Sequence, residues 1–240
     1  MHRILCSAFF VFTLASCSTA PEIKDLELRE RIQNDSVEGA RVDSWLHESL
    51  KRVNESSMNN ALTEIAQKIA TASKVLYPGP PRVELFRSEK VVNYSMPAPT
   101  LYISLATLKG VQFENELAAA IALEFAHLEL RHFFSGLEES ESLLEPRFRD
   151  YLKNGFRFEL MEAAIPYAVQ LLYDANYDPR GMANWWEYQS RHLGQTQMTK
   201  EQVRKGIDTA YRAISRQSPL MSPIVQSPEF EKLKSRVRNL

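Results

Sequence analysis

Glu124 and His127 are three residues apart in an apolar stretch, residues 114–132, that reads ENELAAAIALEFAHLELRH. In a helix of the His-Glu-x-x-His type, two imidazoles one turn apart bind one zinc ion. The Glu after the first His takes a proton from the metal-bound water. Glu124 could be that base and His127 a ligand. Leu123 stands in place of the first His, however, and a leucine cannot coordinate a metal.

The same two residues permit a purely structural interpretation. Side chains three residues apart share a helix face, and a buried Glu needs a partner. A hydrogen-bonded Glu124–His127 pair would satisfy both groups without metal. A lone imidazole on a buried helix is more often a core residue than a ligand, so the sequence favours this interpretation. Arg131 and His132 are expected to make structural contacts at the helix end.

Two short strands are expected to lie beside this helix. Residues 83–86 and 101–105 alternate in polarity, as half-buried strands do. Pro97 and Pro99 cannot donate ladder hydrogen bonds, so residues 93–100 are expected to form a turn or a sheet edge.

The rest of the chain reads as helix. Apolar residues at helical spacing predict helices over 26–50 (interrupted near Gly39), 58–76, 148–175 (kinked or restarted at Pro166), 179–193, 200–216 and 229–239. The predicted fold class is therefore α+β, predominantly helical with a small sheet.

The N-terminus reads as a lipoprotein signal. Residues 1–16 have a short basic start and an apolar run too short to span a bilayer, and they end in Leu-Ala-Ser before Cys17. This resembles the bacterial lipobox, in which the peptide is cut before a cysteine that is then acylated. An ordinary secretory signal or a short membrane anchor is the alternative.

Three segments and a location follow from the lipoprotein interpretation. They are a signal peptide (1–16), a lipid-anchored tether with an N-terminal helical arm (17–57) and the main domain (58–240). Ser18 after the cysteine implies sorting to the outer membrane, with the protein facing the periplasm and anchored at Cys17. Lys and Arg number 29 and Asp and Glu 30, so the charge balance does not favour nucleic acid as a partner.

Three blocks of the chain resemble one family of zinc metallopeptidases. That family contains the heat-shock protease HtpX, the CAAX prenyl endopeptidase and the periplasmic proteases LoiP and BepA. Its helix commonly reads ELAAVLAHEIAHVxxRH, which residues 116–119 and 127–132 match without a gap. Upstream, Asn93, Pro97 and residues 101–105 align with a substrate-binding edge strand. Downstream, residues 175–179 (ANYDP) match a family segment that reads AGYDP.

The resemblance implies a zincin-like (gluzincin) fold but an incomplete metal site. It places the first ligand at Leu123, the second at His127 and the third, a Glu in the family, at Met161. Two of three ligands are thus apolar, while Glu124 remains as a vestigial or working base. The implied substrate-binding residues are Leu101, Tyr102, Ile103 and Ser104.

The sequence favours a pseudo-peptidase over two other hypotheses. The favoured function is an envelope lipoprotein that binds polypeptide clients or envelope proteins in protein quality control, with no metal cofactor. The first alternative is a divergent active zinc metalloendopeptidase, using His127 with ligands from Glu124, Glu159, Glu162, His132 or His192. The second is a helical lipoprotein without a binding role, in which the groove beside residues 101–105 is filled by the protein's own side chains.

Overall fold

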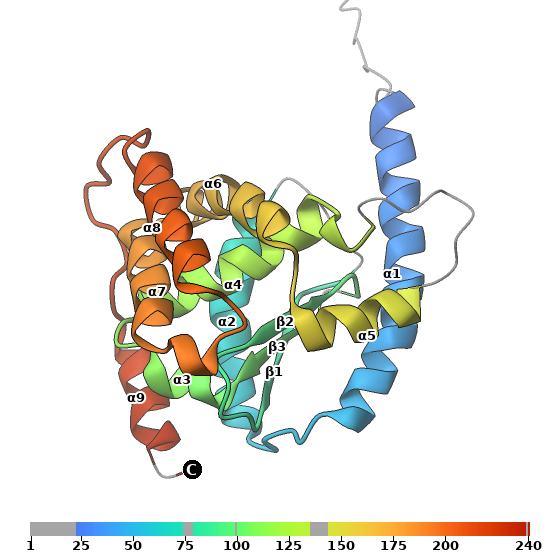
Figure 1. The fold of residues 1–240 in the computed structure, drawn as a ribbon, viewed down its shortest axis with the longest axis horizontal. Helices are drawn as coiled ribbons and strands as arrows, with labels where there is room; N and C mark the ends of the chain where they lie inside the picture. Colours follow the sequence, from blue (N-terminus) through green and yellow to red (C-terminus); the bar gives the residue numbers. More distant parts are fainter. Residues whose placement is uncertain (1–22, 74–78, 99, 135–143, 239) are drawn as a thin grey trace, which may run out of the picture.

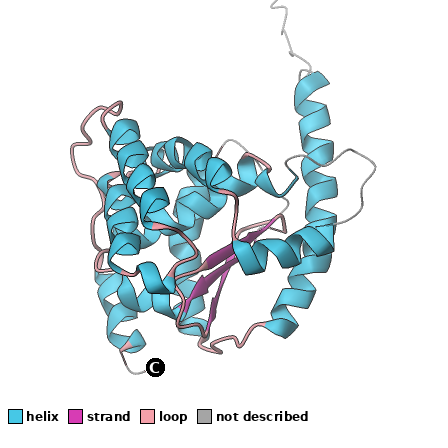
Figure 2. Ribbon diagram, viewed as in Figure 1, coloured by secondary structure: helices cyan, strands magenta, loops and turns pink. Residues whose placement is uncertain are grey.

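The structure is a computed structural model that describes residues 23–73, 79–98, 100–134, 144–238 and 240. The predicted signal peptide and Cys17 lie outside the described residues. The described part is mostly helical with one small sheet (Figure 2), which confirms the α+β prediction. None of its helices is long and apolar enough to cross a membrane.

Helices surround the three strands on several sides (Figure 1). In chain order the elements are α1 (Ile23–Ser49), α2 (Ser56–Ala72), β1 (Arg82–Phe86), β2 (Asn93–Met96), β3 (Thr100–Ser104), α3 (Leu105–Gly110), α4 (Glu114–Glu129), η1 (His132–Phe134), α5 (Leu144–Asn154), α6 (Phe158–Asp174), α7 (Arg180–Arg191), η2 (Leu193–Gln195), α8 (Lys200–Ile214) and α9 (Pro228–Val237).

The sheet has the strand order β1-β3-β2, with β1 parallel and β2 antiparallel to β3. The prediction that residues 101–104 form an edge strand is therefore wrong, because β3 is paired on both sides. The edge next to α4 is β2, so of the two alternatives expected for residues 93–100, a turn or a sheet edge, the sheet edge is confirmed for residues 93–96. Pro97 directly follows β2, so its missing N–H does not interrupt the ladder.

Helix α4 is the buried centre of the molecule. Every residue from Glu114 to Leu128 is buried, and the helix packs against α2, α6, α7 and β2. A helix that is covered on all sides needs no polar face, which explains the dense run of alanine and leucine. Glu116 accepts a hydrogen bond from the Gln112 backbone N–H at 2.7 Å and helps to fix the start of α4.

The predicted interruption near Gly39 is wrong, and so is the predicted restart at Pro166. Helix α1 continues through Gly39, where a Cβ would lie 2.8 Å from the Ala98 backbone nitrogen, so this glycine permits close packing and does not end the helix. Helix α6 continues through Pro166. The break in the predicted helix 148–175 falls at residues 155–157, where Gly155 has a φ of +71°.

The contact between α7 and α8 carries a stability prediction. A Cβ at Gly206 would lie 2.4 Å from Cε3 of the fully buried Trp186. We expect Gly206→Ala to destabilise the fold by about 2 kcal/mol, because the steric cost exceeds the gain in helix propensity. Denaturant unfolding measures this. Gly194→Ala is the matched control, since its Cβ would meet nothing within 4 Å, and an equal loss there would contradict the steric explanation.

Candidate functional site

The three positions that the resemblance assigns to metal ligands meet in the structure. His127 on α4 is fully buried, and its Nε2 lies 3.3 Å from the sulfur of Met161 on α6. Leu123, one turn before His127, lines the same cavity as Met161. Met161 thus lies beside the ring nitrogen of His127 at which a metal would bind, although 34 residues separate the two in the chain.

The other nitrogen of His127 is held by a second imidazole. His127 Nδ1 lies 2.8 Å from Nδ1 of His132, and the Phe156 ring stacks on His127 with centroids 4.0 Å apart. Burial and the neighbouring His132 lower the pKa of His127 well below its ordinary value, so the ring is neutral at pH 7. His127 is therefore a satisfied core residue, and its predicted pairing with Glu124 is replaced by His132 and Met161.

Glu124 has a different set of partners, which come from β2 and α5. The Tyr151 hydroxyl lies 3.4 Å from Glu124 Oε2 and can donate to it. Burial raises the pKa of Glu124 to about 7, and the nearby hydroxyls of Ser95 and Tyr151 oppose this shift. The sequence contained no spacing signal for Tyr151, because α5 is separated from α4 by residues that carry no motif.

The outer edge of β2 faces the same tyrosine. In an antiparallel pair, the backbone groups of successive residues point alternately toward and away from the partner strand. The backbone N–H of Ser104 donates to the Val92 carbonyl, so the backbone groups of Asn93 and Ser95 point away from β3. The Tyr151 hydroxyl lies 3.5 Å from the Asn93 carbonyl oxygen. Helix α5 lies between the sheet and α1 (Figure 1) and so places a side chain against the sheet edge.

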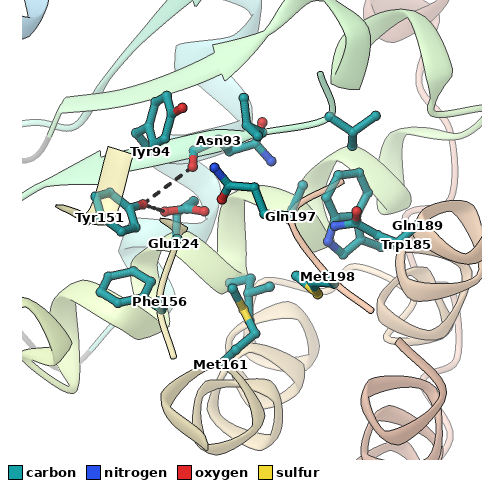
Figure 3. A pocket seen from close by; sticks show the side chains of 15 residues that line it. Asn93, Tyr94, Glu124, Tyr151, Phe156, Met161, Trp185, Gln189, Gln197 and Met198 are labelled. Carbon is teal, nitrogen blue, oxygen red and sulfur yellow. Dashed lines mark hydrogen bonds between the residues drawn. The ribbon is translucent and has the colours of Figure 1, made fainter. Parts of the chain in front are cut away.

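A small cavity lies between β2, α4 and α7. Its volume is about 50 Å³, and Figure 3 shows Glu124 and Tyr151 on one side with Trp185 and Gln189 on the other. It adjoins a larger cavity of about 220 Å³. The two share five lining residues, which are Gly155, Phe156, Met161, Gln197 and Met198. Trp185, Gln189 and Gln197 were not predicted as site residues.

The predicted substrate-binding residues Leu101, Tyr102, Ile103 and Ser104 do not reach this cavity. All four are fully buried in β3, and both sides of that strand are already paired. A further strand therefore cannot add to β3. The prediction of a sheet edge at these residues is wrong, because alternation identifies a strand but does not give its place in the sheet.

The donor set around His127 does not fit the zinc ion that the resemblance implies. At the Nε2 side of His127 the one further donor in contact among the described residues is the Met161 thioether, because His132 contacts the Nδ1 side and Leu123 has no donor atom. Two of the substitute ligands considered above have other partners: Glu162 accepts from Thr209 at 3.0 Å, and His192 Nδ1 lies 2.9 Å from the Tyr188 carbonyl. Within the described ranges, no three His, Cys, Asp or Glu side chains are grouped to hold a metal.

A scan against protein-family models and a search of curated proteins found nothing that matches this chain.

Proposed function

We propose that this chain is a cell-envelope lipoprotein with a zincin-like fold that binds polypeptides and does not hydrolyse them. One observation carries the proposal. Of three positions chosen from a sequence resemblance, Met161 contacts His127 and lines one cavity with Leu123, and neither Leu123 nor Met161 is the His or Glu ligand of the family. Such convergence is expected if the framework of a metallopeptidase site persists after its ligands are replaced.

The surroundings of His127 support the same proposal. Metal-binding histidines usually donate their second nitrogen to a neighbouring group that orients the ring. His132 provides such a partner on the Nδ1 side, and Nε2 is thereby directed at Met161. Glu124 lies one turn away on the same helix and faces the cavity, as a former general base would (Figure 3).

The edge of β2 is the place at which a polypeptide would bind. A peptide in extended conformation could pair with the outward backbone groups of Asn93 and Ser95. The Tyr151 side chain of α5 lies against those groups and would have to move away before a peptide could pair with them. The outer edge of β1 is less suitable, because Thr63 and Asn59 accept hydrogen bonds from the backbone N–H groups of Val83 and Leu85.

The experiment uses peptides selected from a random phage-displayed library on the folded protein. We expect a selected peptide to slow hydrogen exchange at the Asn93 and Ser95 amides, and mass spectrometry to recover it uncleaved. Protection elsewhere, or a library that yields no binder, would contradict the binding site. Hydrolysis at one bond that Glu124→Gln abolishes would instead support an active peptidase.

A further inference from the structure

The cavity beside Glu124 contains buried polar atoms that have no hydrogen-bond partner within the described part of the chain. They are Asn93 Oδ1, Trp185 Nε1 and Gln189 Oε1. Gln189 and Trp185 are only 4% and 2% exposed, so bulk water does not reach them freely. Buried polar groups without partners are rare in native proteins, and each one here borders the same space. Together they indicate that the cavity accommodates a polar guest.

The charge of the lining indicates which guest fits. Glu124 is the one carboxyl group among the described lining residues, and no Lys, Arg or His accompanies it there. Asn93 and Gln189 add two carbonyl oxygens that lack donors. Tyr151 and Phe156 contribute aromatic rings to the wall. Oxygen acceptors, one carboxylate and aromatic rings are the surroundings that favour an organic cation.

We propose that this cavity binds a primary ammonium group, which a lysine side chain or the N-terminus of a bound polypeptide would supply. This inference rests on the proposed function in one respect, namely that a polypeptide delivers the ammonium. An ammonium has three N–H donors, and the lining supplies three acceptors, namely Glu124, Asn93 Oδ1 and Gln189 Oε1. The Trp185 N–H is a donor, so an ammonium does not satisfy it. The volume of about 50 Å³ leaves room for an ammonium head group.

The rest of the guest has a route out of the small cavity. The adjoining space of about 220 Å³ begins at the shared residues Met161, Met198 and Gln197. Gln197 also contacts the last turn of α5 through the Leu152 and Lys153 carbonyls, at 3.5 and 3.3 Å. An alkyl chain could therefore lie along the methionines while its ammonium reaches Glu124.

The protonation of Glu124 couples binding to pH. The groups that face this carboxyl from the packed elements are hydroxyls, from Ser95 and Tyr94 on β2 and Tyr151 on α5. With a pKa of about 7, Glu124 is mostly neutral at pH 6 and mostly ionised at pH 8. An ammonium ion binds the ionised form, so affinity should rise about tenfold between these values while the amine itself stays charged.

The test uses n-butylammonium, an analogue of the lysine side chain, with 1-butanol as the neutral comparison. The readout is the indole N–H resonance of Trp185 in ¹H–¹⁵N spectra, assigned with Trp185→Phe. We expect butylammonium to shift this resonance with a Kd of about 1 mM at pH 8, and about tenfold more weakly at pH 6. 1-Butanol should leave it unchanged.

Two variants on α4 test the role of the carboxylate. Glu124→Gln keeps the side-chain volume and should weaken butylammonium binding by at least about tenfold at pH 8. Glu129→Gln is the matched control, because Glu129 is a half-buried glutamate on the same helix that accepts from Tyr167 and lies outside the cavity. Equal losses in the two variants, or none in Glu124→Gln, would overturn the assignment.

Peptides then separate the two sources of the ammonium and the two proposals. An N-acetylated peptide with one lysine and a lysine-free peptide with a free N-terminus each carry one ammonium. Whichever binds identifies the source. If butylammonium binds and no peptide does, the ammonium site stands and the polypeptide function fails. If peptides bind and butylammonium does not, the cavity holds water only and the ammonium inference is overturned.

Discussion

Leu123→His combined with Met161→Glu is expected to create a zinc site from the present one. Both positions lie beside His127, whose Nε2 is already directed at residue 161 by His132 on its other side. The variant would supply two imidazoles one turn apart and a carboxylate, the ligand set of a zincin. We expect zinc to bind at least about a thousandfold more tightly than to the unaltered protein, a change of about 4 kcal/mol.

Isothermal titration with zinc and metal analysis of the purified variant measure this gain. Leu123→His with Met161→Gln is the matched control, since the amide has the shape of the carboxylate but is a poor zinc ligand. The control should bind zinc much more weakly than the Glu variant. Equal affinities would show that residue 161 does not face the metal position and would remove the main support for the zincin-like fold.

Glu124→Gln is expected to stabilise the folded protein above neutral pH. The pKa of Glu124 is raised to about 7 in the folded state from an ordinary value of 4.5. Between these values the folded state retains a proton that the unfolded state has lost, so the wild-type free energy of unfolding falls as pH rises. The loss is about 3 kcal/mol in total and is complete above pH 7. A glutamine stays neutral and avoids this loss.

The measurement is the difference in unfolding free energy between wild type and Glu124→Gln at several pH values. A difference is needed because the lowered pKa of His127 opposes the effect of Glu124 below pH 6.5. The unfolding free energy of Glu124→Gln minus that of the wild type should be about 3 kcal/mol larger at pH 8 than at pH 4.5. A difference that is constant across this range would mean that Glu124 has an ordinary pKa. Residues kept at a stability cost are typical of functional sites.

Local patterns in the sequence determined the element types and most of their positions. The apolar run at 114–129 predicted a buried helix, and alternation predicted β1 and β3, because both patterns record which side chains must leave water. Alignment of the sequence with the motifs of the family it resembles identified Leu123, His127 and Met161 as one set of positions. The structure places these three together, although the function that the resemblance implies remains a proposal.

Only the tertiary structure decided which groups became partners. His127 pairs with His132 and not with Glu124, and Glu124 faces Tyr151, which lies 27 residues away. The order of the strands, which makes β2 the edge and β3 the centre, also depends on long-range packing. Periodicity reports burial for each residue separately. It carries no information about which distant side chain fills the adjoining space, so the cavity and its unpartnered atoms could not be predicted from the sequence.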